Sequence, residues 1–358
     1  MADEKQVDVQ STAVKTADAQ FGLDTFGDVT VGLDDSPVSQ AQTIRNLIAE
    51  GTLADQLGLN FFGVGEHHRV DFAVSAPEVV LAGLATVTKN IHLGSAVTVL
   101  SSDDPIRVFQ RFATVDALSS GRAEVILGRG SFTESFPLFG FDLGQYEQLF
   151  EEKLDLFTHL IAEQPVTWQG NLRPALHEQN VYPRTEGGSI PTWIGVGGSP
   201  ESVVRAARYG LPLVLAIIGG DPKRFAPYAE LFHRALAQLE KPDLPIAVHS
   251  PGYVADTDDQ AAEQYWPHHR VMRDRIGAER GWPPSSPDEY RNEIAHGSLY
   301  LGSPETVARK LAATIQALGI QRFDLKYSAG TLPHERMMRS IELYATEVVP
   351  MVKDILNR

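Results

Sequence analysis

Short apolar stretches alternate with helical patterns along most of the chain, and this alternation limits the possible folds more than any other feature. Each stretch is bounded by polar residues, which is typical of strands buried on both faces of a parallel sheet. Helical periodicity, with apolar residues three or four positions apart, fills the intervals. The expected strands cover residues 21–26, 61–65, 91–100, 122–128, 191–196, 213–217, 245–254 and 322–327.

This alternation predicts an α/β fold in which residues 21–358 form a single (β/α)8 barrel domain. An open, doubly wound sheet is the alternative, because periodicity does not prove closure. Insertions near 165–190 and 275–302 interrupt the pattern, and they should cover the carboxyl ends of the strands if they shape a substrate pocket. Otherwise they serve packing or oligomer contacts. Residues 1–20 lack the apolar run of a signal peptide and predict a flexible N-terminal tail.

The composition argues against several classes of function. The 358-residue chain has a formal net charge of -15, which disfavours a nucleic acid partner because phosphate backbones are bound by clustered Lys and Arg. It contains no cysteine, which excludes disulfides, thiolate catalysis and Cys-based zinc sites. Redox chemistry therefore requires a bound cofactor. No apolar stretch is long enough for a membrane span, and we expect a cytoplasmic protein without a membrane partner.

The second expected strand runs directly into a carboxylate and two imidazoles, Glu66, His67 and His68. These side chains cannot remain in the apolar core, so they belong at the carboxyl end of the strand, where parallel sheets bind ligands. Glu66 can hydrogen-bond one imidazole and fix its tautomer, or it can simply hold the turn. The alternatives are two surface histidines or a metal site, although no further ligand follows at a diagnostic spacing.

Two other strand ends carry small or basic residues. Ala96 and Val97 lie in a run of small residues that either lets a flat ligand approach the backbone or simply lines the barrel. Arg129 stands between two glycines after the fourth strand. A guanidinium at this place is suited to an anion such as phosphate, and an interstrand salt bridge is the alternative.

A glycine-rich turn, Gly197-Gly198-Ser199, joins the fifth strand to the next helix. Free N–H groups and the positive end of the helix dipole predict a phosphate-binding loop here, and an ordinary N-capped turn is the alternative. The turn lacks the lysine of a P-loop and the pattern G-x-G-x-x-G, which disfavours an ATPase or Rossmann site. A second histidine pair, His268-His269, lies in a polar helix and predicts a solvated face.

Five segments carry a family resemblance: Glu66-His67-His68; Gly94–Leu100 with Pro105–Arg107; Leu118–Arg122 leading into Gly128–Gly130; Pro191–Gly195; and Gly302–Ala308. In this order, the segments resemble the bacterial luciferase-like superfamily of flavin-dependent monooxygenases and oxidoreductases, over residues 21–349. The resemblance implies a (β/α)8, or TIM, barrel that binds FMN at its C-terminal mouth, or the deazaflavin F420 in one branch.

The resemblance also implies roles for individual residues. His67 matches the active-site histidine, which would donate or accept a proton, and His68 would be its neighbour. Ala96 and Val97 fall where the family has a non-prolyl cis peptide beside the isoalloxazine ring. The implied cofactor-binding residues are Glu66, Ala96, Val97, Arg129, Ser131, Gly197, Gly198 and Ser199. The luciferase branch has Glu-Ser where this chain has Gly197-Gly198, which leaves phosphate contacts to backbone N–H groups.

For function, the resemblance implies an FMN-dependent oxidoreductase, in particular a two-component monooxygenase. Such an enzyme takes FMNH2 from a separate flavin reductase and uses O2 on a small organic substrate. Phe132, Phe136 and Phe139 suggest that this substrate is apolar. The alternatives are an F420-dependent dehydrogenase, a non-enzymatic flavin-binding protein and a metal-dependent barrel hydrolase. The family also implies a homo-oligomer, a dimer or a tetramer.

Overall fold

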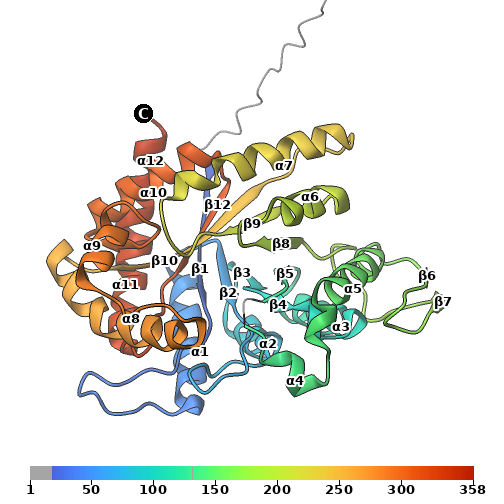
Figure 1. The fold of residues 1–358 in the computed structure, drawn as a ribbon, viewed down its shortest axis with the longest axis horizontal. Helices are drawn as coiled ribbons and strands as arrows, with labels where there is room; N and C mark the ends of the chain where they lie inside the picture. Colours follow the sequence, from blue (N-terminus) through green and yellow to red (C-terminus); the bar gives the residue numbers. More distant parts are fainter. Residues whose placement is uncertain (1–17, 131) are drawn as a thin grey trace, which may run out of the picture.

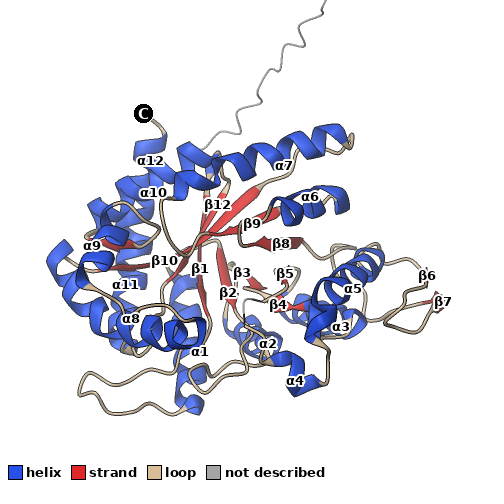
Figure 2. Cartoon of the chain, in the orientation of Figure 1, coloured by secondary structure: helices blue, strands red, loops and turns tan. Residues whose placement is uncertain are grey.

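The computed structural model describes residues 18–130 and 132–358, and it contains a closed barrel of parallel strands surrounded by helices (Figures 1 and 2). The barrel strands, in spatial order, are β12 (Arg322–Lys326), β1 (Gln20–Thr25), β2 (Phe61–Val64), β3 (His92–Ser95), β5 (Ala123–Gly128), β8 (Thr192–Val196), β9 (Leu213–Ala216) and β10 (Ile246–Val254). Pairing of Ala216 with His249 between β9 and β10 helps to close the ring. The expected (β/α)8 barrel is confirmed.

Helices cover the outside of the barrel, and two of them show how local chemistry sets the ends of a helix. Ser199 and Ser303 cap the helices that follow them, each of which has proline in its first turn. Gly210 and Gly319 end the same helices in the left-handed conformation. The outer helices are α1 (Gln40–Gln56), α2 (Pro77–Val87), α3 (Pro105–Ser119), α5 (Tyr146–Leu160), α6 (Pro200–Tyr209), α7 (Ala226–Gln238), α10 (Pro304–Leu318), α11 (His334–Leu343) and α12 (Val349–Leu356).

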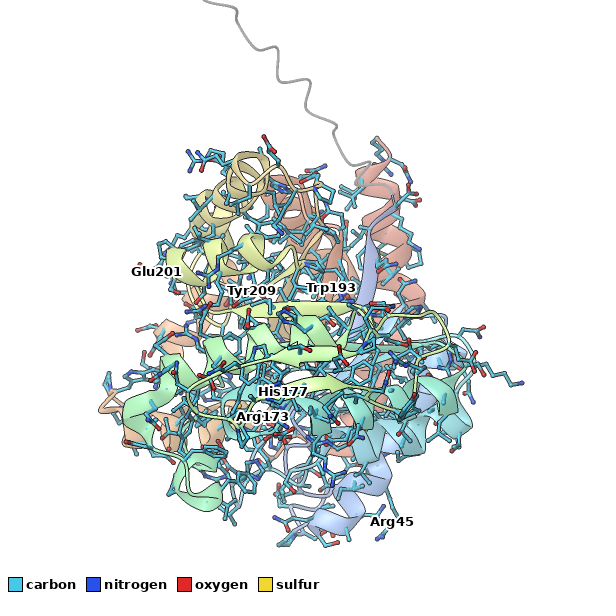
Figure 3. All side chains as sticks on the ribbon, turned by 90° about the vertical axis from the view of Figure 1, so that its right-hand side faces the viewer. Arg45, Arg173, His177, Trp193, Glu201 and Tyr209 are labelled. Atoms are coloured by element: carbon cyan, nitrogen blue, oxygen red, sulfur yellow. The ribbon has the colours of Figure 1, made fainter. Side chains whose placement is uncertain are left out.

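The two insertions differ in position. The first contains an antiparallel hairpin of β6 (Val166–Trp168) and β7 (Leu176–Gln179), which lies beyond α5 at the edge of the molecule in Figure 1. The indole of Trp168 donates a hydrogen bond of 2.8 Å to Asp155 of α5, so this hairpin packs against a helix. Figure 3 looks onto it, with Arg173 and His177 labelled.

The second insertion contains more helix than the sequence predicts. Helix α8 (Asp258–Arg280) continues past its expected end near residue 274, and α9 (Pro287–Ala295) and β11 (Tyr300–Gly302) follow it. Near the carboxyl end of α8, Glu279 forms an ion pair with Arg69 of the loop after β2. This insertion therefore reaches the mouth of the barrel.

The single strand expected over residues 91–100 is also interrupted. It is divided into β3 and the two-residue β4 (Thr98–Val99), and a cis peptide bond joins Ala96 to Val97 between them. The short helix α4 (Ser135–Phe139) was not expected either. None of the helices described is long and apolar enough to pass through a membrane.

The N-terminal end of the barrel is closed by a buried cation. Arg322 is 1% exposed, and its guanidinium lies over the rings of Phe61 and Trp193 at 4.1 and 4.3 Å. It donates hydrogen bonds of 2.7 Å to Glu124 and 3.0 Å to Asp324. Because a buried charge needs close partners, these contacts fill the floor of the barrel with a paired polar cluster.

The C-terminal end of the barrel is open. Trp193 and Val214 belong to the buried interior cluster, whereas Gly195 and Ala216, two residues further along the same strands, are partly exposed. Past the end of β9, Ile218 is 64% exposed. Accessibility therefore rises along β8 and β9 toward the mouth where the sequence places the candidate residues.

Candidate active site

Glu66 joins two segments of the mouth through both of its carboxylate oxygens. Oε2 accepts a hydrogen bond of 2.9 Å from the backbone N–H of Val99, and Oε1 accepts one of 3.0 Å from Nε2 of His68. The hydrogen bond to Glu66 raises the pKa of His68 above its usual value and outweighs the opposing effect of burial. Of the two roles considered for Glu66, the hydrogen bond to one imidazole is present, and the same carboxylate fixes the backbone close to Ala96-Val97. Whether Glu66 also contacts a cofactor stays a prediction.

His67 lies in a cluster of aromatic rings. The ring of Phe72 stacks on it at 4.4 Å, while Phe26 and Phe132 meet it edge to face at 4.8 and 5.0 Å. Its backbone N–H donates to the carbonyl of Val74 at 3.0 Å, which fixes the chain after β2. The three rings keep most water away from the imidazole and restrict the rotation of the His67 side chain.

A carboxylate that the sequence did not single out lies beside the imidazole of His67. Oε1 of Glu134 is 3.7 Å from Nδ1 of His67 and accepts a hydrogen bond of 3.4 Å from the backbone N–H of His68. Burial alone would raise the pKa of Glu134, but the His67 side chain and nearby N–H groups hold it below its usual value. An ionised Glu134 can orient the His67 ring.

Ala96 and Val97 form one wall of the mouth with several glycines. An added Cβ would lie 2.5 Å from the Val97 side chain at Gly128 and 3.0 Å from it at Gly195. At Gly65 it would lie 3.0 Å from the carbonyl oxygen of Ala96. The three glycines therefore let the Val97 side chain and the Ala96 carbonyl lie close against the neighbouring strands. The cis peptide that the resemblance implies is present, while its contact with a cofactor stays a prediction.

Arg129 and the N-terminus of α6 come together, as the two candidate anion contacts require. Nη2 of Arg129 donates to Oγ of Ser202 at 3.1 Å, and Oγ of Ser199 donates to the same Oγ at 2.7 Å. Arg129 also forms an ion pair with Glu147 of α5, so its salt bridge is made to a helix and not between strands. The guanidinium is thus held beside the helix start.

The turn before α6 has the properties of an anion-binding loop. Among the described residues, none accepts a hydrogen bond from the backbone N–H of Gly198 or Ser199. Gly198 has a φ of +106°, which side chains rarely tolerate, and an added Cβ at Gly197 would meet open space. These N–H groups fit a phosphate. Ser131, which the resemblance also implies as a cofactor contact, lies outside the described residues.

The second histidine pair is not on a solvated face, so that prediction is wrong. His268 is buried, and its Nδ1 lies 2.9 Å from Oγ1 of Thr331. His269 lies against the rings of Tyr265 and Tyr290, and burial lowers its pKa to about 4. The polar composition of α8 was misleading because two other segments cover its histidines. The loop after β12 covers His268, and α9 covers His269. Across residues 18–130 and 132–358, no group of three or more His, Asp or Glu side chains is arranged to hold a metal ion.

Comparison with known proteins identifies related sequences over most of the chain. A family model described as luciferase-like monooxygenase matches residues 21–322. N-acetyl-S-alkylcysteine monooxygenase of Bacillus subtilis is 30% identical over 241 residues, which cover 66% of this chain and 68% of the relative. An alkanal monooxygenase alpha chain of Photorhabdus luminescens is 24% identical over 92% of this chain and 97% of its own length.

Solved structures share the fold at lower sequence identity. A monooxygenase from Streptomyces bottropensis superposes with a TM-score of 0.80 at 22% identity, over 92% of this chain and 99% of its own. The oxygenating constituent of 3,6-diketocamphane monooxygenase from Pseudomonas putida, in complex with FMN, gives 0.73 at 19% identity, over 93% and 98%. An F420-dependent secondary alcohol dehydrogenase gives 0.72 at 18% identity, over 93% and 99%.

Proposed function

The chain belongs to the luciferase-like monooxygenase family, and from this premise we propose that it is an FMN-dependent, two-component monooxygenase. It would take FMNH2 from a separate reductase and use O2 on a small organic substrate. One observation carries the proposal: a guanidinium and a helix N-terminus lie together at the same mouth as the wall that Ala96 and Val97 form with the glycines around them. An anionic tail and a flat ring are the two parts of FMN that these features suit.

Arg129 and the turn before α6 would hold the phosphate. The N–H groups of Gly198 and Ser199 would donate to its oxygens, and the dipole of α6 favours negative charge at this end. Arg129 would add a charged donor from the side of β5. Because Glu147 already pairs with Arg129, the phosphate would share or displace this ion pair.

Ala96 and Val97 would support the ring system. Gly128 and Gly195 make room for the Val97 side chain, and Glu66 holds the following backbone at Val99. A bound reduced flavin supplies the electrons with which O2 is activated. The residues around it have to position the ring and keep water out of the mouth.

His67 would hold or move the proton that oxygen transfer requires. Its imidazole is surrounded by Phe26, Phe72 and Phe132, so few water molecules compete for that proton. Glu134, 3.7 Å from Nδ1 of His67, would orient the ring. Glu66 would hold the His68 ring and the backbone at Val99, and neither residue would contact the substrate.

Anaerobic titration of the purified protein with FMN, FMNH2 and F420, followed by admission of O2, tests the proposal. We expect FMNH2 to bind most tightly and the bound flavin to be oxidised when O2 is admitted.

An F420-dependent dehydrogenase is the second candidate, favoured by the structural likeness to an F420-dependent alcohol dehydrogenase. Binding of F420 alone would overturn the FMN assignment, and flavin binding with no substrate oxidation would indicate a non-enzymatic binding protein.

A further inference from the structure

A second histidine faces the interior of the barrel on a different strand. His249 of β10 donates a hydrogen bond from Nδ1 to Oδ2 of Asp24 of β1 at 2.6 Å, although 225 residues separate them in the sequence. Its ring stacks on Phe26 at 5.8 Å with an angle of 17° between the planes. Phe26 also meets His67 edge to face. Both imidazoles therefore contact one phenyl ring.

We propose that Asp24 and His249 form a substrate-binding pair in which Nε2 of His249 accepts a hydrogen bond from an O–H or N–H group of the substrate. This inference rests on the proposed function, since it assigns a substrate class to the same mouth. The class is a small apolar molecule that carries one hydrogen-bond donor, such as an alcohol, a phenol or an amide. An ether or a hydrocarbon of the same shape would lack that group.

The first argument is the orientation of the imidazole. Because Asp24 accepts from Nδ1, the neutral ring carries its proton on that nitrogen and leaves a lone pair on Nε2. No described residue forms a hydrogen bond with Nε2 of His249. A histidine held by a carboxylate with its second nitrogen free has the geometry of a hydrogen-bond acceptor.

The second argument is position. His249 pairs in register with Ala216, which is partly exposed at the carboxyl end of β9. Ala247, two residues earlier on β10, is fully buried in the interior cluster above the floor of the barrel. The pair therefore lies at the level where the interior becomes accessible from the mouth.

The third argument is an unsatisfied acceptor. Asp24 is 1% exposed, and its Oδ1 has no hydrogen-bond partner among the described residues. The Asp24–His249 pair therefore keeps unused hydrogen-bonding capacity, and a substrate donor would reach it through Nε2 of His249, because Oδ1 of Asp24 is buried.

Phenol and anisole form a matched pair of probes, because they share a ring and differ in the O–H donor. We would titrate both into the full-length protein labelled with 13C at histidine Cε1 and follow the His249 resonance, assigned by its loss in His249→Asn. We expect phenol to shift this resonance and to bind about tenfold more tightly than anisole, the factor that one hydrogen bond contributes. In His249→Asn the two probes should bind equally, and in Asp24→Asn the preference should fall.

His92 supplies the control, since its Nδ1 lies 2.9 Å from Glu124 in the same kind of pair, but it is 46% exposed at the start of β3. His92→Asn should keep the preference for phenol. Equal binding of the probes to the unmodified protein, no binding of either, or a preference that survives in His249→Asn would each overturn the proposal. FMN titration of the same samples separates this result from the proposed function, because the probe measurement needs no flavin.

Discussion

Oε2 of Glu66 accepts a hydrogen bond of 2.9 Å from the backbone N–H of Val99, so the carboxylate after β2 holds the chain just beyond the Ala96–Val97 peptide. The other oxygen, Oε1, accepts a hydrogen bond from His68. Glu66 therefore couples the histidine segment to the wall on which a flat cofactor would lie. The carboxylate directly before the candidate catalytic histidine thus has a structural role.

Replacement of Glu66 by glutamine should lower the pKa of His68 toward 6.5, because the carboxylate raises it. A raised histidine pKa stabilises the folded state below the unfolded pKa, and this contribution is lost as pH rises through the folded pKa. The loss in unfolding free energy should thus be about 1 kcal/mol near pH 5.5 and smaller at pH 8. NMR titration of His68 and urea denaturation at both pH values measure these effects. A His68 pKa unchanged by the substitution would contradict the assignment.

Replacement of His67 by alanine should leave FMN affinity largely intact and lower turnover by about 100-fold or more, the usual contribution of a general acid or base. Stopped-flow spectroscopy of the protein–FMNH2 complex mixed with O2 and substrate measures turnover, and fluorescence titration measures affinity. His233→Ala is the control, because His233 pairs with Asp243 on the surface. Normal turnover in the His67 variant would show that the assigned role is wrong.

Replacement of Arg129 by glutamine should weaken FMN binding by roughly tenfold or more and leave riboflavin binding nearly unchanged, since only FMN carries the phosphate. The control is Arg205→Gln, because Arg205 forms an ion pair with the same Glu147. Fluorescence titration of both ligands gives the two affinities. If the variant bound riboflavin and FMN equally weakly, Arg129 would support the structure of the site and would not contact the phosphate.

The two glycines before α6 should respond differently to alanine. Gly198→Ala forces a side chain to a φ of +106° and should cost at least about 1 kcal/mol of unfolding free energy. Gly197→Ala should change stability by less than about 0.5 kcal/mol, because its Cβ would meet nothing within 4 Å. Denaturation in the absence of cofactor compares them. Equal losses would mean that backbone conformation does not distinguish the two positions.

Replacement of Arg322 by methionine should destabilise the barrel by about 3–5 kcal/mol, because it leaves Asp324 buried without its cation and Glu124 with His92 as its remaining basic partner. Arg339→Met provides a surface comparison, and its loss should be about 0–1 kcal/mol since Arg339 is half exposed. Urea denaturation of both variants measures the difference. A small loss at Arg322 would show that the floor cluster relaxes or admits water.

Much of the site follows from the order of elements in the sequence. The carboxyl ends of parallel barrel strands meet at one mouth, so residues that follow the strands come together whatever their separation in the chain. Glu66, His67, Arg129 and the Gly197–Ser199 turn are brought to that mouth in this way. Their contacts with a cofactor stay predictions.

Other relationships arise only in the folded structure. The sequence did not single out Glu134 as the neighbour of His67, and it did not predict the burial of His268. The pair of Asp24 and His249 was not visible either, because β12 lies between their strands. Local periodicity records which face of an element is buried and thereby determines the alternation of strands and helices. Which side chains meet across its interior depends on closure and on the register of distant strands, and only the tertiary structure decides these.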